Sequence, residues 1–256
     1  MSRALIITYH AIEPGPRPLC VPPELFRLHL DAVIAAGVRA VTVSELVREL
    51  VSSTRGERLV AITFDDGFAS VADHAAPLLA ARGLTATVFC VAGHVGGRND
   101  WVGNAASGFD SPLLSAEQIS ALASEGVEIG SHGFAHAPLS ATAPSELERE
   151  LVRSRDALER VTDRQVRSYA YPYGAAPTAE ARSFVEATYA AACTTRVAPV
   201  ELRPDVYALP RVDAHYLRRP ELLRRALQGS LGPYLALRRI GARARRSLFE
   251  DYDNLE

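Results

Sequence analysis

Short apolar runs alternate with amphipathic stretches along most of this chain, and this alternation restricts its fold more than any other feature. Apolar runs rich in β-branched residues predict strands at 4–8, 38–43, 59–64, 85–91, 127–129, 166–170, 190–194 and 206–212. Helical spacing and capping residues, Ser44 among them, predict helices at 23–36, 44–50, 69–82, 115–125, 144–161 and 178–188. Strands that alternate with helices form a parallel sheet with the helices outside it.

The number of these units favours an α/β barrel. Seven or eight strand–helix units suit a closed or nearly closed barrel of the triosephosphate isomerase type. An open, doubly wound sheet is the alternative, but no G-x-G-x-x-G follows the first predicted strand. Gly93, Gly96 and Gly97 have the wrong spacing for that motif, and no predicted helix begins behind them.

Composition excludes several kinds of chemistry. The 256 residues suffice for one domain with a large core. A net charge of −2 gives no reason to expect a nucleic acid partner. All basic residues are arginine, so a lysine Schiff base, a phosphate-loop lysine and a lysine general base are excluded. The three cysteines are widely spaced and suggest no disulfide framework, which predicts a reducing compartment.

The sequence also predicts a cytoplasmic location. The first ten residues contain only a short apolar run, interrupted by Tyr9 and His10, and they lack the cleavage site of a signal peptide. No stretch approaches the roughly 20 apolar residues that a membrane-spanning helix needs.

Two adjacent carboxylates, Asp65 and Asp66, follow the predicted strand 59–64 and precede Gly67. Neighbouring carboxylates repel each other unless a cation or a shared proton lies between them. Alternation along an extended chain directs them differently, so that one can bind a metal while the other faces a substrate. The simpler interpretation is that Asp66 caps the next helix.

Two histidines four residues apart, His132 and His136, follow another predicted strand. His10 and Tyr173 also come after strands, and the carboxyl ends of barrel strands meet at one face. Two imidazoles and one carboxylate form a site of the catalytic zinc type, with positions left open for water and substrate. The residues therefore predict a site for Zn²⁺, with Co²⁺ or Ni²⁺ as alternatives, that includes Asp66.

Three segments resemble the motifs of a known family. TFDDG at 63–67, SHGFAH at 131–136 and YAYPYG at 169–174 have the order and approximate spacing of the first three motifs of the polysaccharide deacetylases. This family includes nodulation-factor, chitin and peptidoglycan deacetylases, and the resemblance covers residues 1–215. It implies a distorted (β/α) barrel of seven or eight units and the metal-dependent removal of N-acetyl groups from amino sugars.

The resemblance also implies a role for each motif residue. Asp65 would be the general base, and the metal ligands would be Asp66, His132 and His136. The backbone N–H of Tyr173 would help to hold the oxyanion.

The chain departs from the family pattern at position 170. Alanine stands there, where the third motif commonly has an arginine that steadies the base. Arg211 is the predicted replacement, and the alternative is that it is a surface arginine at a strand end.

The general acid has two candidates, His10 and His215. The late aspartate-and-tryptophan motif of the family is not recognisable. The segment ITYHAI resembles the start of the biofilm poly-N-acetylglucosamine deacetylases, in which circular permutation moves the last motif to the N-terminus. That resemblance favours His10, and the alternative is an ordinary core histidine.

Two regions outside the motifs also carry predictions. Trp101 and Tyr171 are candidates for stacking on a sugar ring, with ordinary packing as the alternative. We expect a catalytic barrel at 1–217 and an arginine-rich helical extension at 218–256. The arginine-rich extension predicts peripheral contact with an anionic membrane, which would suit a lipid-linked substrate. The alternative is that it forms a last helix that packs on the barrel.

Two other functions compete with deacetylation of a sugar. One is a hydrolase of the same fold that acts on a linear or cyclic amide outside carbohydrates. The other is a carbohydrate-binding relic without activity, against which the intact set of Asp65, Asp66, His132 and His136 argues.

Overall fold

The computed structural model describes residues 4–52, 58–101 and 109–238. Its sheet is parallel throughout and runs in the order β7-β6-β5-β4-β3-β1-β8, while β2 pairs with the start of β3. The strands are β1 (Ala4–Tyr9), β2 (Arg39–Val41), β3 (Leu59–Phe64), β4 (Thr87–Cys90), β5 (Glu128–Ser131), β6 (Ser168–Ala170), β7 (Ala191–Cys193) and β8 (Val212–Asp213).

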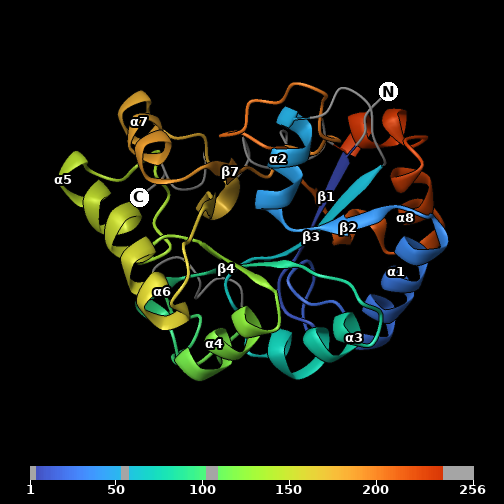
Figure 1. Ribbon diagram of the computed structural model, residues 1–256, viewed down its shortest axis with the longest axis horizontal. Helices are drawn as coiled ribbons and strands as arrows, with labels where there is room; N and C mark the ends of the chain where they lie inside the picture. Colours follow the sequence, from blue (N-terminus) through green and yellow to red (C-terminus); the bar gives the residue numbers. More distant parts are fainter. Residues whose placement is uncertain (1–3, 53–57, 102–108, 239–256) are drawn as a thin grey trace, which may run out of the picture.

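Helices surround the curved sheet (Figure 1). They are α1 (Pro23–Ala35), α2 (Val43–Ser52), α3 (Ala76–Ala80), α4 (Ala116–Ser124), α5 (Pro144–Leu147), α6 (Ser154–Thr162), α7 (Ala179–Thr188) and α8 (Pro220–Leu227). A bridge between Cys193 and Leu209 joins the two outer strands of the sheet, β7 and β8, through the segment that precedes β8. The predicted barrel is therefore confirmed, and the open, doubly wound alternative is not.

Three predicted elements differ from the structure. Of the predicted strand 206–212 only Val212 belongs to a strand, β8, since Pro210 has no N–H for a ladder hydrogen bond. The predicted helix 144–161 contains a π-helical turn, η4 (Glu148–Arg153), between α5 and α6. A second π-helical turn, η1 (Val71–Ala75), begins the helix predicted at 69–82.

The N-cap of α2 is Thr42 and not Ser44. The Thr42 hydroxyl accepts a hydrogen bond from the Glu45 N–H at 3.2 Å, and the Glu45 carboxylate accepts one from the Thr42 N–H at 3.0 Å. This reciprocal pair is a capping box. Ser44 instead donates its hydroxyl and its N–H to the carboxylate of Glu128, which joins the start of α2 to the start of β5.

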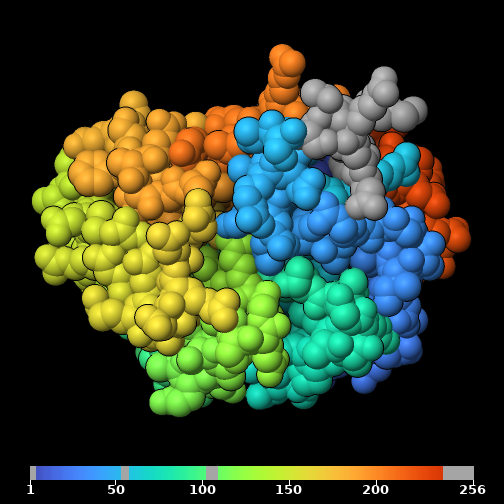
Figure 2. Space-filling model, viewed as in Figure 1, coloured from blue at the N-terminus to red at the C-terminus, as the bar shows by residue number. Residues whose placement is uncertain are grey.

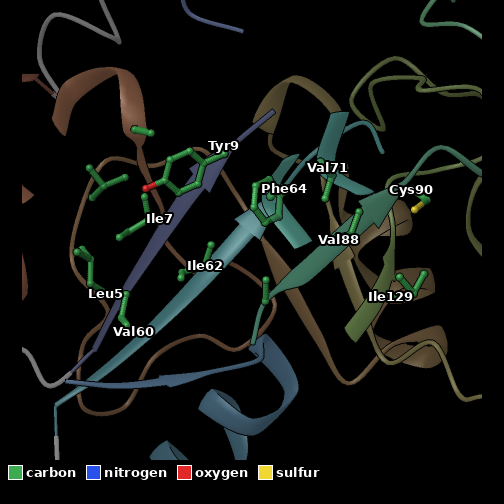
Figure 3. Packing of buried hydrophobic residues seen from close by; sticks show 14 of the residues in the cluster. Leu5, Ile7, Tyr9, Val60, Ile62, Phe64, Val71, Val88, Cys90 and Ile129 are labelled. Atoms are coloured by element: carbon green, nitrogen blue, oxygen red, sulfur yellow. The ribbon is translucent and has the colours of Figure 1, made fainter. Parts of the chain in front are cut away.

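The strands separate two cores because successive side chains point to opposite faces. The outer core lies between the sheet and the helices, and Figure 3 shows part of it. Its members on β1 and β3 are Leu5, Ile7, Tyr9, Val60, Ile62 and Phe64. The inner core fills the barrel and includes Ala4 and Ile6 of β1, Leu59 and Ala61 of β3, and Val43 of α2.

A cavity of about 550 Å³ lies at the end of the barrel where the strands begin. Its lining comes from α2 and from the segments that lead into β5, β6 and β7, and Figure 2 views this face. None of the predicted site residues lines it.

The arginine-rich segment begins as part of the folded body. Leu223 and Leu227 of α8, and Leu231 and Leu235 after it, are buried in the outer core. The rest of the predicted extension, from residue 239, lies outside the described residues. Among the helices that are described, none has the length and apolar character to cross a membrane. The three cysteines, Cys20, Cys90 and Cys193, are buried and free.

Candidate active site

Asp66, His132 and His136 converge at the ends of β3 and β5, and all three are buried. The Nε2 atoms of His132 and His136 each lie 3.4 Å from Oδ1 of Asp66. Ligands bonded to a tetrahedral zinc ion at about 2.1 Å lie about 3.4 Å from one another. The distances from Asp66 to the two histidines are therefore those that such an ion requires.

The tautomer of His132 also suits a metal. A carbonyl oxygen can only accept, so Nδ1 of His132 donates its proton to the Ala170 carbonyl at 2.8 Å. Its Nε2 is then free to bind, which is the usual arrangement of a metal-ligating histidine. The ring of His136 packs against Trp101, with 4.4 Å between the ring centroids. The donor set and its support thus fit a divalent cation.

The charges around these ligands favour a cation as well. Burial would raise the pKa of Asp66, but its bonds to His132 and His136 outweigh burial and hold that pKa well below its usual range. Burial would lower the pKa of His132, but Asp65 and Asp66 outweigh it and raise the pKa. Burial lowers the pKa of His136, and Asp66 only partly offsets it. The site holds an ionised carboxylate between two imidazoles.

The second carboxylate, Asp65, forms a bidentate ion pair with Arg211 at 2.6 and 2.7 Å. Both side chains are almost wholly buried, at 1% exposure for Arg211 and 4% for Asp65. The predicted partnership is therefore observed, and the surface alternative for Arg211 is wrong. Burial would raise the pKa of Asp65, but Arg211 and then His132 outweigh it, so that the pKa is lowered.

Of the two histidines proposed as the acid, His10 is the one whose charge acts on Asp65 and Asp66, while both act on Asp213. His10 follows β1 in the register that points into the barrel. His215 lies on the short helix η6 (Ala214–Leu217), where its backbone N–H donates to Oδ1 of Asp213 at 2.7 Å.

Asp213 is a site residue that was not predicted from the sequence. It belongs to β8, two residues after Arg211, and therefore points to the same side of the strand. Burial raises its pKa, and the charge of His10 opposes that effect. The sequence signal was the alternation in RVD, but it could be interpreted only once β8 was known to pair with β1.

Backbone strain is concentrated in this site. The backbone φ angle is positive at Asp66 (71°), His136 (59°) and Tyr173 (56°). Among the described non-glycine residues only Asp163, at the end of α6, shares this property. Strained backbone of this kind persists where the surrounding structure imposes it, often at functional sites. Tyr173 is 49% exposed, and its ring lies 4.6 Å from the His136 ring, measured between centroids.

The two residues predicted to stack on a sugar do not expose their rings. Tyr171 is 1% exposed, lies in the outer core and donates its hydroxyl to the Tyr207 carbonyl at 3.1 Å. The predicted role does not fit this position, because strand alternation turns the ring away from the barrel. Trp101 is 6% exposed and packs on His136 and His94, which is the packing alternative. The segment after it, 102–108, lies outside the described residues.

A parallel barrel with an Asp–His–His group and a second, arginine-bound carboxylate at its strand ends defines the chain as a hydrolase. A model of the polysaccharide deacetylase family matches residues 52–192, which is more than half of the chain. The chain belongs to the polysaccharide deacetylase family and is an enzyme of the deacetylase type. The resemblance seen in the three motifs is thereby confirmed.

Individual relatives agree with this assignment. The polysaccharide deacetylase YxkH of Bacillus subtilis is 26% identical over 208 residues, which cover 81% of this chain and 70% of YxkH. IcaB from Ammonifex degensii is 24% identical with a TM-score of 0.74, over 90% of this chain and 97% of its own. The deacetylase PplD of Streptococcus pyogenes, solved with acetate, is 21% identical with a TM-score of 0.74. The match covers 90% of this chain and 98% of PplD.

At these identities the solved structures show the fold. The chain spans 64% of the length of the solved structure of BA0330 from Bacillus anthracis and 98% of that of PplD.

Proposed function

We propose that this enzyme is a divalent-metal-dependent hydrolase that removes N-acetyl groups from amino sugars in an oligosaccharide, polysaccharide or lipid-linked glycan. The observation that carries the proposal is the pairing of two carboxylates with different partners. Asp66 lies between two imidazoles, and Asp65 is bound by Arg211. The names of YxkH and PplD, and the acetate bound to PplD, support the same chemistry.

Asp66, His132 and His136 would hold the metal. When bound, a divalent ion supplies Lewis-acid chemistry, which polarises a carbonyl and makes a water molecule more acidic. The spacing of the three ligands and the Nδ1 hydrogen bond of His132 support this assignment.

Asp65 acts as the general base. It accepts the proton of the water that attacks the acetyl carbon, and Arg211 keeps it ionised and fixes its orientation. The backbone N–H of Tyr173, on a strained turn beside His136, helps to hold the oxyanion that forms.

His10 acts as the general acid. It gives a proton to the amide nitrogen as the C–N bond breaks, and the products are acetate and a free amino sugar. The charge of His10 acts on the carboxylates of Asp65 and Asp213, which supports this role. The cytoplasmic location and the membrane contact of residues 218–256 stay predictions.

The test is acetate release from N-acetylglucosamine oligomers. We expect the wild type to release acetate, to stop after chelation and to recover with added Zn²⁺ or Co²⁺. Asp65→Asn and His132→Ala should each lose at least 100-fold in kcat, while His74→Ala, at an exposed position, should not. Full turnover after chelation, or release of acid only from small amides outside carbohydrates, would contradict the proposal.

A further inference from the structure

The loop that carries both histidines is held by a buried carboxylate. Glu150 is 2% exposed and belongs to the π-helical turn η4. Its Oε2 accepts the Phe134 N–H at 3.0 Å, and both carboxylate oxygens accept the Ala135 N–H, at 3.1 and 3.2 Å. Phe134 and Ala135 are two of the three residues between His132 and His136.

The opposite side of this loop is also fixed. The carbonyls of Gly133 and Phe134 accept hydrogen bonds from the backbone N–H groups of Ala92 and Gly93, at 3.0 and 2.8 Å. The amides of Phe134 and Ala135 therefore face Glu150, and the carbonyls of Gly133 and Phe134 face the segment after β4. A loop held on both sides has little freedom to rotate its histidines.

Gly133 lets the carboxylate approach. Its φ is +85°, and a Cβ atom at this position would lie 3.0 Å from Oε2 of Glu150. A side chain here would be strained by its backbone angle and would crowd the carboxylate.

A second contact joins the same helix to the same loop. Ser154 donates its hydroxyl to the Glu150 carbonyl at 2.7 Å and lies 2.9 Å from the Ser131 hydroxyl. The Ser131 hydroxyl in turn accepts the N–H of Gly133 at 3.2 Å. The π-helical turn, a feature often found at functional sites, thus contacts the histidine loop directly through Glu150, and Ser154 at the start of α6 supports the loop through Ser131.

No ion pair accounts for the burial of Glu150. Throughout the described ranges its carboxylate has backbone N–H groups as its partners and forms no salt bridge. The neighbouring Glu148 and Arg149 are exposed to solvent. A buried carboxylate is costly to desolvate unless its hydrogen bonds compensate, so these amides are the reason for its position.

We propose that Glu150 is a positioning residue of the metal site: its carboxylate fixes the His132–His136 loop in the conformation that directs both imidazoles at Asp66, before a metal binds. The inference rests on the proposed metal-dependent function. His136 has a strained φ of 59°, which a loop released from Glu150 would not retain. Glu150 acts through the backbone and touches none of the three ligands.

The test uses Glu150→Gln, which keeps the shape of the side chain but removes its charge and one of its two acceptor oxygens. We expect Zn²⁺ or Co²⁺, measured by competition with a chelator, to bind about tenfold more weakly. The visible spectrum of the Co²⁺ form should change, because the imidazoles are less well aligned. Glu148→Gln, an exposed change on the same turn, should leave both the affinity and the spectrum unaltered.

A measurement on the metal-free wild type requires no variant. The N–H groups of Phe134 and Ala135 should be protected from hydrogen exchange before metal is added, and Glu150→Gln should lose that protection. Unprotected amides in the wild type overturn the inference, even if the variant fails to fold. A folded variant with the affinity and Co²⁺ spectrum of the wild type overturns it as well. A wild type that binds no metal contradicts the proposed function itself, which distinguishes the two failures.

Discussion

At the scale of single residues, the Arg211–Asp65 pair sets the chemistry of the proposed base. Two parallel N–H···O bonds fix both oxygens of the carboxylate, a geometry that a guanidinium can provide and an ammonium cannot. The ring of Phe89 lies 5.6 Å beneath the guanidinium, measured to the ring centroid. The base is thus held in one orientation by its partner.

Arg211→Lys should therefore lower kcat and shift the pH profile. Arg211 lowers the pKa of Asp65, so a weaker partner lets that pKa rise. Because the base must be ionised, the acid limb of kcat/KM against pH should move to higher pH. The matched control is Arg196→Lys at a nearby exposed position. An unchanged acid limb in Arg211→Lys would show that Asp65 is not the titrating base.

Removal of the guanidinium should also destabilise the fold. Arg211→Met leaves the buried Asp65 without its counter-charge, and the loss of one partner of a buried pair typically costs about 3–5 kcal/mol. Urea unfolding at neutral pH measures this loss. The double variant Arg211→Met, Asp65→Asn should recover part of the stability that Arg211→Met loses. Equal stability of the single and the double variant would show that the unpaired carboxylate is not the cause of the loss.

At the scale of elements, strand alternation accounts for what the sequence could predict. The register of β1 and β3 directs His10 and Asp65 into the barrel, and the HxxxH spacing after β5 brought His132 and His136 into the prediction. The contact between Asp65 and Arg211 joins residues 146 positions apart. It depends on where β8 pairs, and no local pattern contains that information.

Other features of the site leave no signal in a single sequence. Positive φ angles at Asp66, His136 and Tyr173 are imposed by tertiary contacts against local preference. The π-helical turn that carries Glu150 interrupts a stretch whose composition predicts one continuous helix. Tyr171 shows the opposite case, in which the sequence predicted a role that the structure does not support. It was predicted to stack on a sugar, but the alternation that continues from β6 places its ring in the outer core.

Arg211, directly before β8, suggests an exchange between two positions. Ala170 ends β6 in the inner core, and the resemblance of the third motif implies an arginine at this position. We expect the double variant Ala170→Arg, Arg211→Ala to regain part of the acetate release that Arg211→Ala loses. Acetate release by the two single variants and the double variant checks this. A double variant no better than Arg211→Ala would show that only β8 can supply the charge.

At the scale of the whole molecule, a buried histidine should make stability depend on pH. His29 of α1 is fully buried, and its Nδ1 lies 2.8 Å from the hydroxyl of Tyr9 on β1. Burial lowers the pKa of His29 from 6.5 to about 4. Between these values the unfolded chain binds the extra proton and the folded chain does not.

The contribution of neutral His29 to the free energy of unfolding is thus fully present above pH 6.5 and is lost as the pH falls towards 4. The loss should reach about 3 kcal/mol, measured as the free energy of urea unfolding against pH. His29→Gln, which retains a partner for Tyr9, should flatten this part of the curve. His74→Gln, at an exposed position, should not, and a wild type equally stable at pH 6.5 and pH 4 would refute the assignment.

Metal should stabilise the whole fold, because a ligand that binds only the folded state raises its stability. At a hundredfold excess over its dissociation constant, Zn²⁺ should add about 2.7 kcal/mol and raise Tm. His136→Ala should abolish that rise, and His74→Ala should retain it. Thermal unfolding with and without a chelator measures both, and a Tm indifferent to metal in the wild type would contradict the proposed site.

Arg211 also has a consequence for how the barrel can vary. Its Nε donates to the Thr194 carbonyl after β7 at 3.0 Å, while its other nitrogens bind Asp65 after β3. One side chain therefore links the two edge strands of the sheet, β7 and β8, and also orients the base. A substitution at position 211 must therefore affect both catalysis and the contact that closes the barrel. Natural variants that lack the arginine should show compensating changes near Thr194 and near Asp65.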